Sequence, residues 1–180
     1  MIQAMQFNSD KYEKGLFELY DEIFTKYSIS GTLLEIGVLH GGSLLWFKNT
    51  GRFEQIVGAD IRLPKNDFGE GIYLHKLDQG SRPELDDMIK QYTDWNVVID
   101  DGSHELEHVI NTFDALWPHT RDIYIIEDWD VAYHCHRFND WNAWISELWR
   151  KKRELGAQEI RVVFDENPSS YHGYIMLRRG

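Results

Sequence analysis

Short apolar runs alternate with amphipathic segments along most of the chain. The runs have the length of strands and are almost continuously apolar, which is typical of strands buried on both faces. The segments between them repeat apolar residues every three or four positions, as helices do. This alternation predicts a parallel sheet with helices on both sides. The predicted strands are 31–37, 55–61, 71–77, 96–100 and 122–128, and the predicted helices are 42–50, 81–92, 105–119 and 140–155.

The two ends of the chain complete this pattern. Residues 1–29 are predicted to be an N-terminal helical segment whose helix begins near Ser9 or Asp10. Segments 159–166 and 172–179 are predicted to pair as a hairpin. We therefore expect a single domain over residues 1–180 with an α/β fold: a Rossmann-like, seven-stranded, mostly parallel sheet with helices on both faces and a C-terminal antiparallel hairpin.

The composition argues against several classes of function. The net charge is −11, whereas binding to nucleic acid or to an anionic membrane needs clustered lysine and arginine. The single cysteine, Cys135, cannot form an internal disulfide, which favours a reducing compartment. The N-terminus lacks a signal-peptide pattern and no apolar run reaches the roughly 18 residues of a membrane helix, so we expect a cytoplasmic protein. Tryptophans are expected either to pack in the core or to form a homodimer face, namely Trp141, Trp144 and Trp149.

Acidic residues follow the predicted strands, at the edge where a parallel sheet binds its ligands. Adjacent like charges repel, so pairs of acids at this edge indicate a bound cation or a group that is to be deprotonated. The residues at these strand ends are Glu35 and Gly37, Asp60, Asp78, Asp100 and Asp101, and Glu127 and Asp128.

The turn after the first predicted strand is rich in glycine. Its Gly37, Gly41 and Gly42 match neither the dinucleotide fingerprint nor the phosphate-binding loop, although they suit close approach of a ligand to the backbone. Ordinary tight turns use such glycines as well. Asp60, at the end of the second strand, is placed to accept both hydroxyls of a ribose, and Asp78, after the third, to meet an exocyclic amine. Together these features favour a nucleoside without a phosphate chain.

Five segments carry a resemblance to a known family. LLEIGVLHGGSL, VGADI, LDQGS, VVIDDGSH and YIIEDWD, in this order and spacing, resemble class I S-adenosylmethionine-dependent methyltransferases. They are similar in particular to the metal-dependent sugar O-methyltransferases of macrolide pathways, of the mycinamicin type, and to the related cephalosporin-hydroxylase-like proteins. The resemblance covers roughly residues 30–130.

The resemblance implies how the cofactor would be held. Residues of the first turn would surround the methionine part of S-adenosylmethionine, the second strand end would hold its ribose, and the third would lie near its adenine. The implied cofactor-binding residues, in that order, are Glu35, Gly37, Gly41 and Ser43, then Asp60, then Asp78 and Gln79, with Asp100 assigned to the same role.

The resemblance also implies a divalent metal held by Asp101, Glu127 and Asp128, with His104 as general base and Asp101 also catalytic. The chemistry of the residues agrees, since three carboxylates make a hard oxygen site suited to Mg²⁺. A metal-bound hydroxyl loses its proton more easily, and a histidine three residues from a ligand is placed to take it. The alternatives are that the acid pairs are solvated strand caps and that His104 follows a turn capped by Ser103 without a role.

These inferences predict an S-adenosylmethionine- and Mg-dependent O-methyltransferase acting on a hydroxyl of a sugar or small polyol-like natural product. Two alternatives stay open: a non-catalytic S-adenosylmethionine-binding module, which needs no metal cluster, and a metal-dependent oxidase or hydroxylase of the cephalosporin-hydroxylase-like group. Three carboxylates without a two-histidine triad suit an Fe(II) oxygenase poorly. The loop 129–141 is expected to help cover the acceptor, and its adjacent His134, Cys135 and His136 are not expected to converge on zinc.

Overall fold

The computed structural model describes residues 9–129, 138–164 and 173–180. Its centre is a seven-stranded sheet with strand order β3-β2-β1-β4-β5-β7-β6. β7 runs antiparallel to both of its neighbours, while the other neighbouring strands pair in parallel, which confirms the predicted fold class. The strands are β1 (Gly31–Ile36), β2 (Phe53–Asp60), β3 (Ile72–Lys76), β4 (Trp95–Asp100), β5 (Thr120–Glu127), β6 (Ala157–Val163) and β7 (Tyr174–Arg179).

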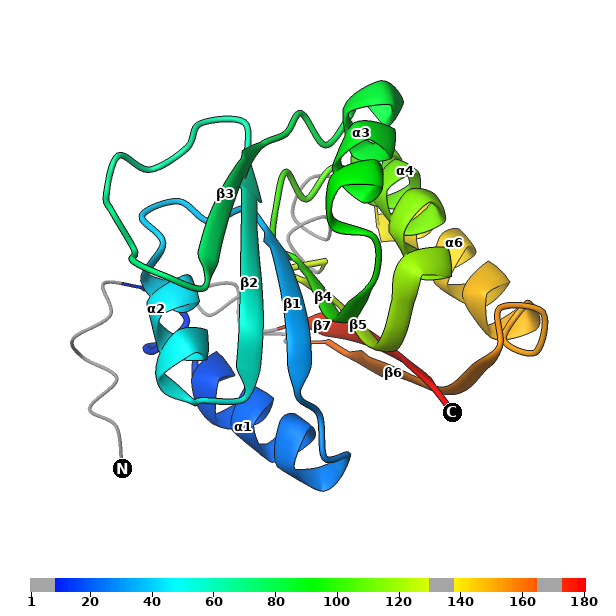
Figure 1. Cartoon of the computed structure of the whole chain (residues 1–180). Coiled ribbons are helices and arrows are strands. Elements are labelled where there is room, and N and C mark those ends of the chain that lie inside the picture. The colour runs from blue at the N-terminus through cyan, green and yellow to red at the C-terminus, as the bar shows by residue number, and fades with distance from the viewer. Residues whose placement is uncertain (1–8, 130–137, 165–172) are drawn as a thin grey trace.

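Helices cover both faces of the sheet (Figure 1). Alternate residues of a strand point to opposite faces, so in β4 Val97 and Ile99 join one core and Val98 joins the other. The first core contains α1 and α2, and the second contains α3, α4 and α6. The helices are α1 (Leu16–Lys26), α2 (Gly42–Asn49), α3 (Arg82–Tyr92), α4 (Leu106–Leu116), the 3₁₀ helix η2 (Trp117–His119) and α6 (Phe138–Arg150).

The first helix begins later than the sequence predicts. α1 starts at Leu16, not near Ser9 or Asp10, because Gly15 has a left-handed φ of 68° that breaks the helical path. Residues 10–15 are turns instead, and this segment matters for the site described below.

The tryptophans divide between the core and the surface. Trp141 is buried and packs against Trp129 and Trp144, whereas Trp149 is 48% exposed. The homodimer stays a prediction. None of the helices in the described parts of the chain has the length and apolar character needed to cross a bilayer. The central part of the loop 129–141, including residues 134–136, lies outside the described residues, as does the connection between β6 and β7.

A close backbone contact joins the ends of β1 and β4. Gly37 follows β1 with a φ of 84°, and a Cβ added to it would lie 2.0 Å from the carbonyl oxygen of Asp101. Only glycine fits both the torsion angle and the space. The contact therefore sets how near the glycine turn lies to the first residue after β4.

We predict that Gly37→Ala destabilises the protein by more than the roughly 1–2 kcal/mol that a left-handed φ costs a non-glycine residue. The added Cβ would also collide with the Asp101 backbone. Gly51→Ala is the matched control, since Gly51 has a similar φ of 68° but nothing within 4 Å of its added Cβ. Urea denaturation measures both changes, and equal losses in the two variants would contradict the tight contact at Gly37.

Candidate active site

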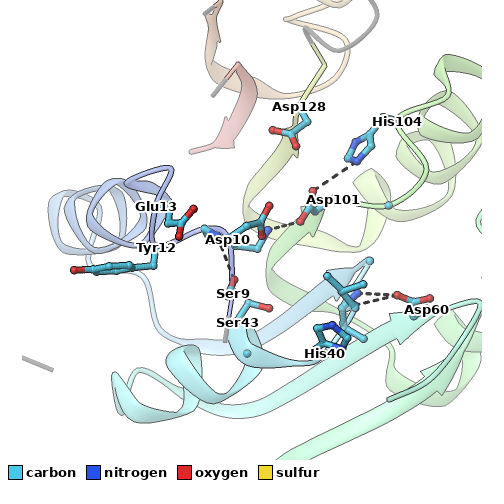
Figure 2. A pocket seen from close by; sticks show the side chains of 16 residues that line it. Ser9, Asp10, Tyr12, Glu13, His40, Ser43, Asp60, Asp101, His104 and Asp128 are labelled. Atoms are coloured by element: carbon cyan, nitrogen blue, oxygen red, sulfur yellow. Dashed lines mark hydrogen bonds and ion pairs between the residues drawn. The ribbon is translucent and has the colours of Figure 1, made fainter. Parts of the chain in front are cut away.

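A cavity of about 740 Å³ opens at the carboxyl ends of the central strands. Its walls come from residues 9–13, the glycine turn after β1, the last residue of β2, and residues that follow β4 and β5. Figure 2 shows Asp101, His104 and Asp128 grouped in one part of the cavity, apart from Asp60 and His40. This is the edge at which the sequence predicts a ligand.

Asp60 ties the glycine turn to the end of β2. Its Oδ2 accepts hydrogen bonds from the backbone N–H groups of Val38 at 3.0 Å and Leu39 at 3.2 Å, and its Oδ1 accepts one from Arg62. Asp60 lines the large cavity and also a smaller cavity of about 210 Å³. It lies where the predicted ribose would be, and it also shapes the turn.

The smaller cavity contains the predicted adenine residues, Asp78 and Gln79. The Gln79 amide is engaged at both ends: its Nε2 donates to Asp100 at 2.6 Å and its Oε1 accepts from the backbone of Ser103 at 2.9 Å. Asp100 is buried and does not line either cavity, so it supports Gln79 from behind. Burial raises the pKa of the Asp100 carboxyl to about 7.

Three carboxylates meet around a buried lysine, and we call Glu35, Asp101 and Glu127 the inner group. Lys11 Nζ lies 2.5 Å from Asp101 Oδ2, 2.5 Å from Glu127 Oε1 and 3.5 Å from Glu35 Oε1. Burial alone would lower the pKa of Lys11, but the three carboxylates raise it well above its ordinary value. Tyr20 donates a further hydrogen bond to Glu127. The three carboxylates of the inner group therefore already surround a cation, the ammonium group of Lys11.

Burial sets the protonation of the inner carboxyl groups. It raises the pKa of Glu35 to about 7, although Lys11 and a 2.5 Å hydrogen bond from Ser43 oppose the shift. Burial and the neighbouring Asp101 raise the pKa of Glu127 to about 8. Ser43, at the start of α2, lines the large cavity, and Gly41 precedes this helix with a left-handed φ of 76°.

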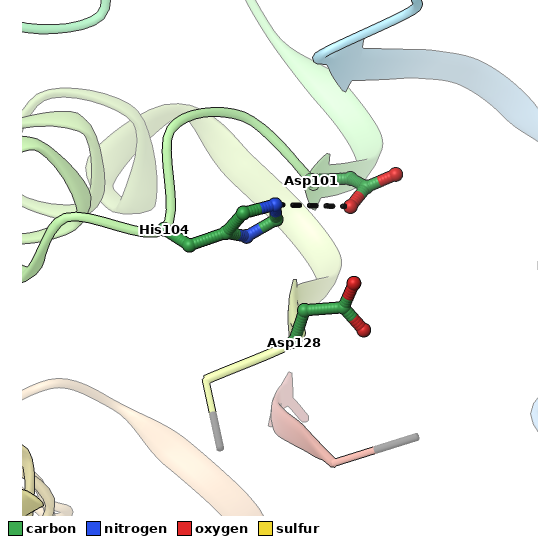
Figure 3. Close-up of side chains that lie close together, drawn as sticks. All are labelled: Asp101, His104 and Asp128. Carbon is green, nitrogen blue, oxygen red and sulfur yellow. Dashed lines mark ion pairs between the residues drawn. The ribbon is translucent and has the colours of Figure 1, made fainter. Parts of the chain in front are cut away.

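A second cluster, the outer group, faces the large cavity and contains Asp101, His104 and Asp128 (Figure 3). His104 Nε2 lies 3.9 Å from Asp101 Oδ1, too far for a hydrogen bond. His104 and Asp128 have φ angles of 55° and 52°, which are unusual for residues other than glycine and are typical of functional sites. Burial raises the pKa of Asp128, against the effect of Lys14, whose Nζ lies 2.9 Å from its Oδ2.

The predicted metal ligands are divided between the two groups. Asp101 belongs to both, while Glu127 is in the inner group and Asp128 in the outer one. Among the described residues, three buried carboxylate oxygens have no hydrogen-bond partner: Glu35 Oε1, Glu127 Oε2 and Asp128 Oδ1. Oxygens buried without a hydrogen bond are costly, and a hard divalent cation would stabilise them, although Glu35 Oε1 already lies 3.5 Å from Lys11 Nζ. The donor chemistry fits such a cation, although Lys11 already lies between Asp101 and Glu127.

The sequence interpretation missed Lys11, Lys14 and Tyr20. Two of them precede α1, in turns that the sequence assigned to a helix, and their partners lie about a hundred positions along the chain. One signal was available: buried acid pairs need cations, and Lys11 and Lys14 are spaced to lie on one side of a turn. No local pattern identified their partners.

No protein-family model matches the chain. A stretch of 125 residues is 38% identical to the mycinamicin VI 2''-O-methyltransferase of Micromonospora griseorubida, covering 63% of this chain and 31% of that protein. A stretch of 124 residues is 36% identical to the demethylmacrocin O-methyltransferase of Streptomyces fradiae, with the same coverage. The matched part thus spans about a third of the length of these curated relatives.

Solved structures give a wider match. The MycE methyltransferase of the mycinamycin biosynthetic pathway, solved with Mg, SAH and mycinamycin VI, superposes with a TM-score of 0.70 at 29% identity, over 90% of this chain and 49% of that one. The methyltransferase domain of bacterial CtHen1 superposes with a TM-score of 0.63 at 14% identity, over 93% and 98% of the two chains. The chain has the class I methyltransferase fold. The predicted resemblance to the macrolide O-methyltransferases is also confirmed.

We predict that Asp100→Asn changes the pH dependence of folding. Because the folded pKa of Asp100, about 7, lies above its ordinary value of 3.8, its stabilising contribution is complete below pH 3.8 and is lost as the pH rises through 7. The uncharged variant avoids that loss, so its free energy of unfolding relative to wild type should increase between pH 5 and pH 8.5. Urea denaturation at both pH values measures this, with Asp67→Asn, at an exposed aspartate, as the control. A constant difference for Asp100→Asn would contradict the raised pKa.

Proposed function

We propose that the chain is an S-adenosylmethionine- and Mg-dependent O-methyltransferase that acts on a hydroxyl of a sugar or small polyol-like natural product. One observation carries the proposal: a single cavity brings the glycine turn and Asp60 together with Asp101, His104 and Asp128. The sequence similarity to two macrolide O-methyltransferases supports the same reaction, and the Mg and SAH of the MycE structure support the same cofactors.

The cofactor would extend between the two cavities. Its methionine part would lie at Gly37, Gly41 and Ser43, backed by Glu35, and its ribose would lie at Asp60. Asp60 Oδ2 already accepts hydrogen bonds from Val38 and Leu39, and Oδ1 accepts one from Arg62, so Oδ1 retains one lone pair for a ribose hydroxyl. The adenine would enter the smaller cavity, where Gln79 is held by Asp100 and Asp78 is exposed.

His104 is the proposed general base. Its imidazole lies at the cavity, close to Asp101 but free of a hydrogen bond to it, so it can face an acceptor hydroxyl. As the hydroxyl oxygen bonds to the methyl carbon, the bond between carbon and the sulfonium sulfur breaks and its electron pair stays on sulfur. The hydroxyl proton passes to His104, and S-adenosylhomocysteine and the methyl ether are the products.

Asp101, Glu127 and Asp128 are the proposed metal ligands. A bound Mg²⁺ would supply Lewis acidity that makes an acceptor hydroxyl more acidic. The protein's own contribution is alignment, since the ends of β4 and β5 fix these carboxylates and His104 relative to the glycine turn after β1.

The second candidate is a non-catalytic S-adenosylmethionine-binding module. Lys11 favours it, because a lysine within the inner group offers an internal cation where the enzyme would need a metal. An oxidase or hydroxylase is less well supported, since the outer group contains one histidine and two carboxylates and not two histidines and one carboxylate. Transfer of a methyl group to an acceptor separates the enzyme from the binding module.

We predict that Asp60→Ala weakens S-adenosylmethionine binding more than tenfold, because the ribose loses a charged acceptor and the glycine turn loses its hydrogen bonds to Asp60. Asp60→Asn, which retains one oxygen for the backbone of Val38 and Leu39, should weaken binding less and leave thermal stability nearly unchanged. Asp67→Ala is the control, since Asp67 caps an exposed turn through Gly69 and lines neither cavity. Isothermal titration calorimetry measures all three, and unchanged affinity in Asp60→Ala would rule out the ribose assignment.

We predict that His104→Ala binds S-adenosylhomocysteine normally but loses about 10²–10⁴-fold of its turnover, the typical contribution of a general base. The assay is transfer of labelled methyl from S-adenosylmethionine, with Mg²⁺, to a panel of deoxysugar glycosides that includes mycinamicin VI and demethylmacrocin. His75→Ala, on β3 and away from both cavities, is the control. Turnover that survives in His104→Ala would remove His104 from the mechanism, and cofactor binding without transfer to any glycoside would favour the binding module.

A further inference from the structure

Lys11 lies where a cation shared by Asp101 and Glu127 would be. Its side chain is only 3% exposed, and its Nζ contacts one oxygen of each carboxylate at 2.5 Å. The second oxygen of Glu127 is buried without a hydrogen-bond partner among the described residues. The inner group is thus a cation site that the chain itself fills.

Lys14 repeats this arrangement one turn later. Its Nζ lies 2.9 Å from Asp128 and 3.0 Å from Asp10. The predicted ligands Asp101, Glu127 and Asp128 therefore each contact an ammonium group from the same short segment, residues 9–15.

The two lysines hold this segment against the sheet. Its backbone hydrogen bonds are local or lead into α1, and within the described chain the hydrogen bonds and ion pairs that join it to the strand ends are those of Lys11 and Lys14. At its end, Gly15 has a left-handed φ of 68° with nothing within 4 Å of an added Cβ. Glycine at this position gives the segment a hinge before the buried helix α1.

We propose that residues 9–15 form a latch that competes with the divalent metal, so that Lys11 and the metal occupy the strand ends in turn and never together. This inference rests on the proposed function, since it concerns the metal site of that reaction. With the latch closed, Lys11 and Lys14 neutralise the carboxylates. With the metal bound, the same oxygens coordinate the ion, the ammonium groups are repelled, and the segment swings away about Gly15.

Competition follows from the size and charge of the two cations. Mg²⁺ binds carboxylate oxygens at about 2.0–2.1 Å and requires near-octahedral geometry. A metal bound jointly by Asp101 and Glu127 would share with Lys11 Nζ both the space and the lone pairs of those oxygens. Residues 9–13 also line the large cavity, so opening of the latch would widen the site as the metal binds.

The test is the Mn²⁺ affinity of Lys11→Met, which retains an apolar stem and removes the competing charge. We expect its Mn²⁺ dissociation constant, measured by calorimetry, to be at least tenfold lower than that of wild type. Its melting temperature should be below wild type in EDTA and should recover with Mn²⁺, because the unpaired carboxylates then regain a cation. Lys90→Met, which removes an exposed lysine paired with Asp87, controls for net charge and should bind Mn²⁺ as wild type does.

Hydrogen exchange in the wild-type protein tests the latch without any variant. Amides of residues 11–16 should exchange faster when Mn²⁺ is added. An Mn²⁺ affinity in Lys11→Met that is equal to or weaker than wild type, or slower exchange with Mn²⁺, would overturn the competition. Titration of the same samples with S-adenosylhomocysteine separates the two proposals. If wild type does not bind S-adenosylhomocysteine, the proposed function is wrong. If both proteins bind it normally but have equal Mn²⁺ affinities, only the latch is wrong.

Discussion

Charge crowding at one edge of the sheet is the constraint on which the rest of the site depends. β1, β4 and β5 lie side by side in parallel, so the carboxylates at their ends are brought together by the sheet itself. Ionised carboxylates at such short separation repel one another strongly when water is excluded. Lys11 offsets this repulsion, while burial first and the neighbouring Asp101 second raise the pKa of Glu35 to about 7 and that of Glu127 to about 8.

The register of the strands makes this crowding unavoidable. Glu35 lies opposite Ile99 in the β1–β4 pair, one residue before Ile36 lies opposite Asp100. The glycine turn then brings the backbone after β1 against the carbonyl of Asp101, where no side chain would fit. The glycine turn and the acidic cluster share one edge because β1 and β4 are parallel neighbours, and Gly37 lets their backbones come into close contact there.

The strands, the helices and the acids at the strand ends could be predicted from the sequence, but contacts between residues far apart in the chain could not. All seven strands and the helices between them were predicted from the alternation of apolar runs with amphipathic segments, and the central strands β1, β4 and β5 are buried as their apolar runs predict. Asp60, Asp101 and Asp128 were predicted to lie near a ligand because residues at the ends of parallel strands share one edge, whereas His104 was assigned through the family resemblance and its spacing from Asp101. The burial of Lys11 was not predictable, since its partners lie 90 and 116 positions away and a lysine among turn residues normally remains solvated. Asp60 and Gln79 were assigned to ligands, and no pattern revealed that they also hold the backbone of Val38 and Ser103.

The acids of the site and the lysines that contact them come from different parts of the fold. The acids come from strand ends whose positions are fixed by the sheet, and His104 and Asp128 are held there in left-handed conformations that the surrounding structure must maintain. The internal cation comes instead from a short series of turns that is joined to the sheet through two lysine side chains and ends at a glycine. A rigid anionic edge facing a hinged cationic segment can exchange one cation for another without rebuilding the sheet. The two ammonium groups that contact these acids both come from residues 9–15, so movement of this one segment would change the cations at the strand ends.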